Sequence, residues 1–160
     1  MDFNAEFVHK MMRLALDEGA RGSSCGDGGP FGAVIVDAKG NLLATAHNRV
    51  LVDHDPTAHA EVTAIREACR RLGTHDLSGC TLFSSCEPCP MCLSAVIWAN
   101  IKLLYFGGTR HDAAKIGFRD QAIYDYLAGD DTLGLQVVAL SPADCRALFA
   151  EYQQNQGQMY

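Results

Sequence analysis

The chain has 160 residues, of which 48% are apolar and 20% are charged, which is enough for one compact domain with a hydrophobic core. Its 13 Lys and Arg against 19 Asp and Glu give a net charge of −6, which repels a phosphate backbone and disfavours nucleic acid as a partner. No apolar run approaches the roughly 20 residues of a membrane span, and acidic residues within positions 1–20 argue against a secretory signal, so we expect a cytoplasmic protein without a membrane partner.

The first part of the chain predicts a helix, a loop and a β-hairpin. Apolar residues within positions 4–18 recur with the period of an amphipathic helix. The glycine-rich stretch 19–30 is expected to be a loop, because glycine and proline disfavour regular structure. The apolar runs 31–36 and 41–46 flank the turn residues 37–40, so we expect the two runs to pair as an antiparallel hairpin.

The remainder of the chain predicts alternating helices and strands. Their expected order is helix 58–72, strand 80–84, helix 89–99, strand 101–106, helix 121–128, strand 135–140 and helix 143–152. A strand, helix and strand in succession give parallel neighbours joined by a right-handed crossover. We therefore expect a three-layer α/β/α fold with a central mixed five-stranded sheet, in which residues 1–160 form a single domain that ends in a polar tail.

The cysteines indicate a metal site. The chain holds 7 cysteines, an odd number, and a domain of this size does not need disulfides, so we expect reduced thiols. Cys89 and Cys92 lie one turn apart at the start of a predicted helix, where unpaired amides favour the thiolate. His59 starts another predicted helix, and one nitrogen with two sulfurs is a donor set that zinc prefers. The sequence therefore predicts Zn²⁺ bound by His59, Cys89 and Cys92.

Glu61 gives this site a catalytic interpretation. Zinc held by three protein ligands keeps an open position, where the pKa of a bound water falls to roughly 7. In the first turn of its helix, Glu61 can border the same point as His59 and act as a general acid/base. Two other interpretations stay open, a redox pair of Cys89 and Cys92 and a structural zinc closed by Cys86, but neither gives Glu61 a role.

The pattern His-x-Glu followed by Pro-Cys-x-x-Cys is the signature of zinc nucleobase deaminases, and the chain resembles the cytidine-deaminase-like superfamily. Segments 28–36, 48–49, 55–65 and 85–92 closely resemble the small bacterial guanine deaminases. The resemblance covers nearly the whole chain. It implies a cytidine-deaminase-like fold and a zinc-dependent hydrolase of purine metabolism that converts guanine to xanthine and ammonia.

The resemblance also implies a second acid and a set of residues that bind the base. Asp120 matches an acid near the departing amine, but Arg119 replaces part of the usual acidic pair, so Asp112 is a second candidate. The implied substrate-binding residues are Phe31, Asn48, Ala60, Trp98 and Tyr160. In the family, the asparagine matching Asn48 hydrogen-bonds the base, and the aromatics matching Phe31 and Trp98 pack against its ring.

The C-terminal residues 153–160 resemble an arm that is exchanged between the two subunits of a homodimer. Its final aromatic, Tyr160, would then close the pocket of the partner subunit, whereas the general expectation for a terminus is a frayed tail.

Other enzymes could share the same metal residues. Cytosine, guanosine or tRNA adenosine deamination is an alternative, and so is a non-catalytic zinc module. The acidic net charge disfavours tRNA, although Arg66, Arg70 and Arg71 could form a local basic patch.

Overall fold

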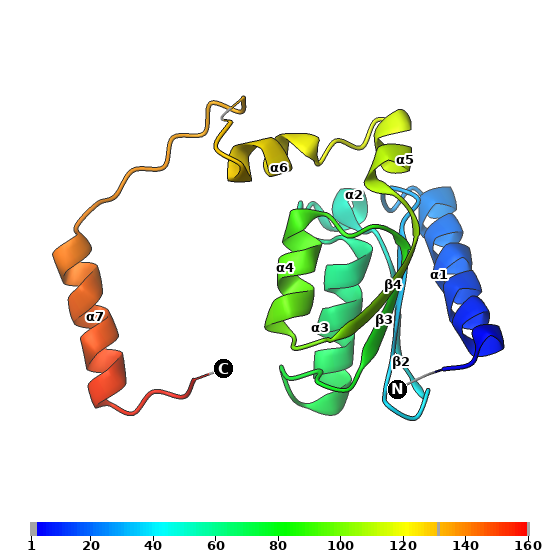
Figure 1. Ribbon diagram of the computed structural model, residues 1–160, viewed down its shortest axis with the longest axis horizontal. Coiled ribbons are helices and arrows are strands. Elements are labelled where there is room, and N and C mark those ends of the chain that lie inside the picture. Colours follow the sequence, from blue (N-terminus) through cyan, green and yellow to red (C-terminus); the bar gives the residue numbers. More distant parts are fainter. Residues whose placement is uncertain (1–2, 131, 160) are drawn as a thin grey trace. The chain divides into compact units, whose positions relative to one another are not determined.

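The computed structural model describes residues 3–130 and 132–159, which fall into two compact units, one up to Tyr124 and the other from Asp125 (Figure 1). The first unit contains α1 (Ala5–Cys25), β1 (Gly32–Val36), β2 (Leu42–His47), α2 (Val50–Asp53), α3 (Ala60–Leu72), β3 (Thr81–Cys86), α4 (Pro90–Trp98), β4 (Leu103–Gly108) and α5 (Arg110–Lys115). Helix α6 (Gln121–Leu127) runs across the boundary, and α7 (Pro142–Gln154) belongs to the second unit.

The strands form a mixed sheet in the order β2-β1-β3-β4. β1 is antiparallel to both β2 and β3, and β3 is parallel to β4, so the predicted hairpin and the predicted crossover through α4 are confirmed. The hairpin turn is fixed by Asp37, whose Oδ1 accepts hydrogen bonds from the amides of Lys39 and Asn41, each at 2.8 Å. The carboxyl ends of β2 and β3 lead directly into the segments that carry the predicted site.

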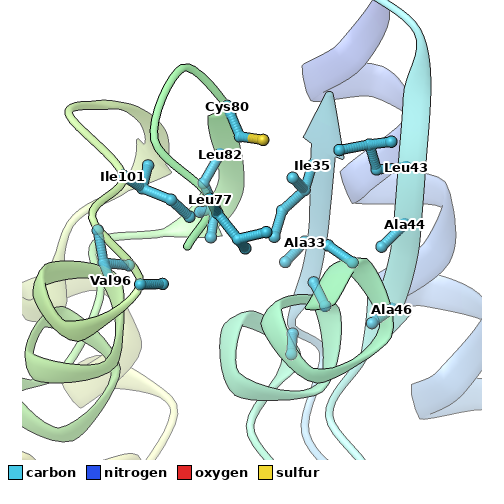
Figure 2. Packing of buried hydrophobic residues seen from close by; sticks show 14 residues of the cluster. Ala33, Ile35, Leu43, Ala44, Ala46, Leu77, Cys80, Leu82, Val96 and Ile101 are labelled. Atoms are coloured by element: carbon cyan, nitrogen blue, oxygen red, sulfur yellow. The ribbon is translucent and has the colours of Figure 1, made fainter. Parts of the chain in front are cut away.

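Helices cover both faces of this sheet. On one face, Val34 and Val36 of β1 pack with Met11 and Ala15 of α1. The alternate β1 residues face a larger cluster, shown in Figure 2, that α3 and α4 complete from the other side. α3 approaches this face through the alanines at positions 60, 64 and 68, each 0% exposed. The three-layer arrangement is thus present within the first unit (Figure 1).

The sheet has four strands among the described residues, so the expected fifth strand at 135–140 is wrong. This segment is irregular and strongly exposed, with Val138 at 81% and Leu140 at 85%. A strand is stabilised by a hydrogen-bonded neighbour and by burial of one face, and the described part of the second unit offers neither. The alternating apolar residues of this segment predict a strand, but they do not provide a second strand to pair with it.

The expected loop at 19–30 begins later than predicted, because α1 continues to Cys25. Glycine weakens an isolated helix, but here it permits close packing against the sheet. A Cβ at Gly19 would lie 2.9 Å from the backbone of Phe31 and Gly32. Glycines in α1 therefore mark a tight contact rather than a break in the helix.

In the second unit, the helix expected at 143–152 is confirmed as α7. After it, the Tyr152 hydroxyl donates a hydrogen bond to the carbonyl of Gln158 at 2.6 Å, so the tail turns back on the end of its own helix. Tyr160 lies outside the described residues. Among the residues that are described, no helix combines the length and apolarity needed to cross a bilayer.

Candidate active site

Two helix N-termini meet at one point, as the sequence predicts. His59 is the N-cap of α3 and Cys89 is the N-cap of α4, and neither side chain makes a capping hydrogen bond. Nδ1 of His59 lies 3.6 Å from Sγ of Cys89 and 3.5 Å from Sγ of Cys92. The three side chains are therefore available to a shared ligand.

The spacing of these atoms fits a zinc ion. In a tetrahedral site, Zn–S bonds of about 2.3 Å and Zn–N bonds of about 2.0 Å place nitrogen and sulfur about 3.5 Å apart. The observed separations match this value. Within the described chain, His59, Cys89 and Cys92 are the group whose donor atoms converge. Cys86 lies outside this group and donates instead to the carbonyl of Thr109 at 3.7 Å, so the structural zinc interpretation loses its fourth ligand.

The ionisation of Cys89 also suits a cation. Hydrogen bonds from Cys92 and His59 lower the pKa of the Cys89 thiol to about 4. The hydrogen bond to Cys89 in turn raises the pKa of His59. The pKa of Cys92 is raised, first by its hydrogen bond to ionised Cys89 and then by burial. One thiolate forms readily, and a bound cation would stabilise the second.

Glu61 lies beside the metal ligands, in the first turn of α3. Its carboxyl group is buried, with the residue 6% exposed, and burial raises its pKa. Oε1 accepts a hydrogen bond from the Ser84 hydroxyl at 3.0 Å, and Oε2 accepts one from the Cys92 thiol at 3.4 Å. A carboxyl group held in this way can accept and release a proton next to the metal centre.

A cavity of about 740 Å³ opens over this centre. Its lining combines residues of the metal centre, residues of the loop that follows α1 and residues from later segments. The lining residues are Gly28, Gly29, Pro30, Phe31, Asn48, Val50, Leu51, Pro56, His59, Glu61, Cys86, Glu87, Cys89, Arg110, Ala113, Phe118, Arg119, Asp120 and Ile123. The rings of Phe31 and Phe118 meet edge to face with their centroids 4.8 Å apart. The cavity lining thus combines the aromatic pair Phe31 and Phe118 with ionisable side chains.

Asn48 has a fixed orientation at the edge of the cavity. It is 4% exposed, and its Oδ1 accepts hydrogen bonds from the amides of Gly29 at 3.3 Å and Val50 at 3.1 Å. Because its oxygen is used in this way, the NH₂ group is the end that can donate to a ligand. A Cβ at Gly28 would lie 2.1 Å from that oxygen, so only glycine fits there.

The two candidate acids have different surroundings. Asp120 lines the cavity. Asp112 instead completes a capping box with Thr109 and pairs with Lys115 at 2.9 Å, and these contacts hold the pKa of its carboxyl far below the usual range. Asp112 is not among the cavity-lining residues, which favours Asp120 as the second acid.

Among the other substrate-binding predictions, Ala60 and Trp98 are not in the cavity lining. Ala60 is fully buried in the core, and Trp98 lies at the end of α4, 69% exposed, so both roles rest on the resemblance alone. Tyr160 lies outside the described residues. Sequence reasoning missed Arg110 and Phe118, which line the cavity from α5 and the segment after it.

Comparison with known proteins agrees with this geometry. Residues 5–108 match the family described as cytidine and deoxycytidylate deaminase zinc-binding region. The chain is 50% identical over 118 residues to the guanine deaminase of Bacillus subtilis, an overlap of 74% of this chain and 72% of that protein. The X-ray structure of guanine deaminase from Bacillus subtilis superposes with a TM-score of 0.84 at 40% identity and covers 95% of both chains.

Two further relatives differ more. A tRNA-specific adenosine deaminase of Haemophilus influenzae is 38% identical over 122 residues, which is 76% of this chain and 70% of that protein. A structure solved in complex with 2,6-diaminopurine has a TM-score of 0.65 at 32% identity, covering 96% of this chain and 85% of that chain.

Proposed function

The chain belongs to the cytidine and deoxycytidylate deaminase family with its zinc-binding region, and from this membership we propose that it hydrolyses guanine to xanthine and ammonia. The observation that carries the proposal is the buried Glu61 carboxyl group beside His59, Cys89 and Cys92, next to a cavity that Glu61, His59 and Cys89 line. Guanine is favoured among substrates by the 50% identity over 118 residues to a guanine deaminase, against 45% over 103 residues and 38% over 122 residues to two tRNA-specific adenosine deaminases. The net charge of −6 also disfavours tRNA.

Each side chain of the site has a defined task in this reaction. Zinc, when bound by His59, Cys89 and Cys92, supplies a Lewis acid that makes water a nucleophile near neutral pH. Glu61 accepts the proton of the attacking water and delivers it to the ring nitrogen beside C2, the carbon that carries the amino group. Ser84 orients this carboxyl group through its hydrogen bond at 3.0 Å.

The second half of the reaction needs a proton on the departing amine, so that neutral ammonia leaves as the C2 carbonyl forms. Asp120 lines the cavity and is the proposed donor. Asn48 donates from its NH₂ group to the base, because its oxygen is already bonded to two backbone amides. The Phe31 ring, which contacts Phe118, packs against one edge of the purine ring.

A substrate panel tests this proposal. The zinc-loaded protein is assayed for ammonia release from guanine, guanosine, adenine, cytosine and tRNA. We expect guanine to give the highest kcat/KM. A higher value for any other member would replace guanine as the substrate, and no release from any member would leave a non-catalytic zinc module.

We also propose that the protein is a cytoplasmic homodimer in which residues 153–160 are exchanged and Tyr160 closes the partner's pocket. Support comes from the resemblance and from the apolar side chains that α7 exposes, with Leu148 at 63% and Phe149 at 68%. Such side chains are stabilised when a second surface covers them.

Removal of residues 158–160 tests the exchanged tail. We expect catalysis to fall while zinc and fold are retained, because an open pocket admits water. Truncated chains mixed with Glu61→Gln chains should recover part of the activity, since an intact Glu61 site can use the tail of its partner. Full activity after truncation would contradict a closing tail, and loss without recovery would place the tail in its own subunit.

A further inference from the structure

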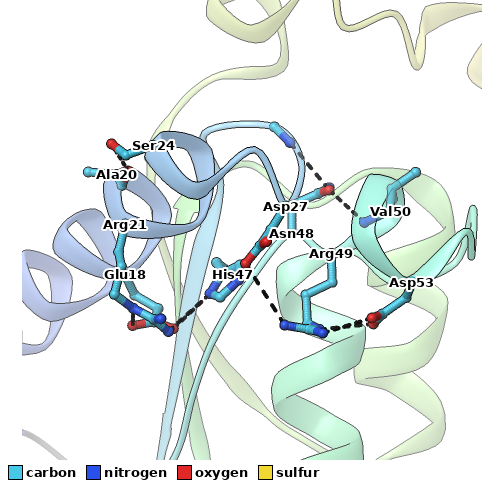
Figure 3. Close-up of polar contacts among 11 residues, drawn as sticks. Glu18, Ala20, Arg21, Ser24, Asp27, His47, Asn48, Arg49, Val50 and Asp53 are labelled. Atoms are coloured by element: carbon cyan, nitrogen blue, oxygen red, sulfur yellow. Dashed lines mark hydrogen bonds and ion pairs between the residues drawn. The ribbon is translucent and has the colours of Figure 1, made fainter.

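Six side chains, alternately basic and acidic, form a chain of polar contacts (Figure 3). In order, they are Arg21, Glu18, His47, Asp27, Arg49 and Asp53. They come from α1, the loop after it, the end of β2 and the short helix α2 with its N-cap. None of the reaction steps above uses them.

His47 is the centre of this chain. Its ring is buried, with Nδ1 2.9 Å from Oε1 of Glu18 and Nε2 2.8 Å from Oδ2 of Asp27. Each ring nitrogen thus faces a carboxylate oxygen at hydrogen-bond distance, one from α1 and one from the loop after it. The Arg21 guanidinium, 3.3 Å from Nδ1, donates to the same Glu18 carboxylate.

Three basic side chains, Arg21, His47 and Arg49, alternate along this chain with the carboxyl groups of Glu18, Asp27 and Asp53. Contacts between basic and acidic groups offset part of the cost of burying them. His47 therefore links α1 to the loop that begins at Asp27.

The backbone of α1 also holds the His47 ring in place. Gly22 lies directly against it, and a Cβ at this position would approach Cδ2 of the ring to 2.2 Å. The ring therefore fills the space that a side chain at position 22 would take. This close approach fixes His47 independently of its hydrogen bonds.

The loop that His47 holds carries one edge of the cavity. The carbonyl of Asp27 accepts hydrogen bonds from the amides of Leu51 at 3.0 Å and Val52 at 3.1 Å, which joins the loop to α2. Two residues later, the amide of Gly29 donates to Oδ1 of Asn48. The Asn48 side chain is oriented by one amide of this loop and by one amide at the start of α2. A displacement of Asp27 would therefore move both of these amides.

We propose that His47 is a positioning residue for substrate binding. Its bridge between Glu18 and Asp27 holds the 28–30 edge of the cavity and, through it, the NH₂ group of Asn48. The role deepens the proposed function, because it rests on the assignment of Asn48 to the base. His47 is neither in the cavity lining nor in the group of metal ligands, so we expect its effect to be on affinity rather than on proton transfer.

Kinetics of His47→Gln and Asp27→Asn test this role. His47→Gln removes the ring that forms the bridge, and Asp27→Asn removes the negative charge of its loop-side carboxyl group. We expect KM for guanine to rise by up to about tenfold, the equivalent of one charged hydrogen bond, with kcat near the parent value. Zinc content should stay at the parent value. His9→Gln, an exposed histidine of α1, is the matched control and should leave both constants unchanged.

A double-variant cycle separates positioning from a general structural effect. In an Asn48→Ala background, His47→Gln should add little to the rise in KM, because the group that it positions is already absent. An undiminished effect in that background, or no change of KM in either single variant, would overturn the proposal.

Amide hydrogen exchange gives a readout that does not need turnover. In His47→Gln, the amides of Leu51 and Val52 should exchange faster, while those of the β1 residues 33–36 keep the parent rate. If the parent fails to deaminate guanine but this local change occurs, the proposed substrate is wrong and the positioning role stands. Unchanged exchange at positions 51 and 52 would overturn the role.

Discussion

The metal side and the loop side of the cavity are built in different ways. The metal side consists of His59, Glu61, Cys89 and Cys92, which lie in the first turns of two helices or cap them. The loop side joins Glu18, Asp27, His47 and Asn48, which come from a helix, a loop and the end of a strand. Two short motifs thus form the metal side, whereas single residues far apart in the sequence form the loop side.

The difference separates chemistry from positioning. On the metal side, each group contacts another ionisable ligand within 3.6 Å, so a substitution there removes a reacting atom or its metal. On the loop side, a substitution shifts backbone that lines the cavity and holds the Asn48 side chain. We therefore expect losses of kcat from the first region and of affinity from the second.

Cys89→Ala should have the largest effect, because it removes a ligand from the metal side. Two remaining protein ligands hold zinc poorly, so both bound zinc and deaminase activity should be lost. Metal analysis of the purified protein measures the first and ammonia release the second. Cys145→Ala, an exposed cysteine of the second unit, is the control and should keep its zinc. Full zinc occupancy in Cys89→Ala would refute the ligand assignment.

Glu61→Gln should separate metal binding from proton transfer within the metal side. Glutamine keeps the shape and can still accept a hydrogen bond from Ser84, so fold and zinc should be retained. Turnover should fall by roughly 10²–10⁴, the usual contribution of a general acid/base. Steady-state kinetics with guanine measures it, and near-normal turnover would exclude Glu61 as the proton carrier.

The metal side could be predicted from sequence because its information is local. His59, Cys89 and Cys92 occupy fixed positions in helix starts that the residue pattern also predicts, and two helix starts bring them together. His47 could not be predicted, because its carboxylate partners lie 29 and 20 residues away and belong to no motif. Only the folded chain places them on opposite sides of one ring.

The fold, like the site, could be predicted from the sequence only where its features depend on residues close together in the chain. The hairpin and the crossover helix were predicted, since periodicity and turn residues are local properties. Gly19 and Gly22 favoured a loop in the sequence, yet they lie in α1, because the space beside them depends on tertiary packing. The segment 135–140 has a strand pattern without a neighbouring strand in the described residues.

Asp120→Asn and Asp112→Asn compare the two candidate acids. Asp120→Asn should lower kcat by roughly 10²-fold with zinc retained, since it removes a proton donor but not the nucleophile. Asp112→Asn should instead weaken the α5 cap and lower the unfolding temperature slightly, with little change in kcat. Kinetics and thermal unfolding of both variants measure the contrast. The reverse result, a crippled Asp112→Asn and an active Asp120→Asn, would assign the second proton to Asp112.

Gly22→Ala should have the smallest effect, because it acts on the loop side only through His47. Alanine favours the helix by up to about 1 kcal/mol, but its Cβ overlaps the imidazole ring. We expect KM for guanine to rise about threefold as the ring is displaced, with kcat unchanged. Ser23→Ala, on the exposed surface of the same helix, is the control. A KM equal to that of the control would mean that the ring tolerates displacement.

The most direct test compares kcat and KM for guanine in Glu61→Gln and Asp27→Asn, measured beside the parent at saturating zinc. We expect Glu61→Gln to lower kcat strongly with KM close to the parent value, and Asp27→Asn to raise KM with kcat close to the parent value. Those outcomes would assign chemistry to the metal side and positioning to the loop side. If both variants lower kcat by the same factor and leave KM unchanged, the two sides of the cavity do not have separate functions.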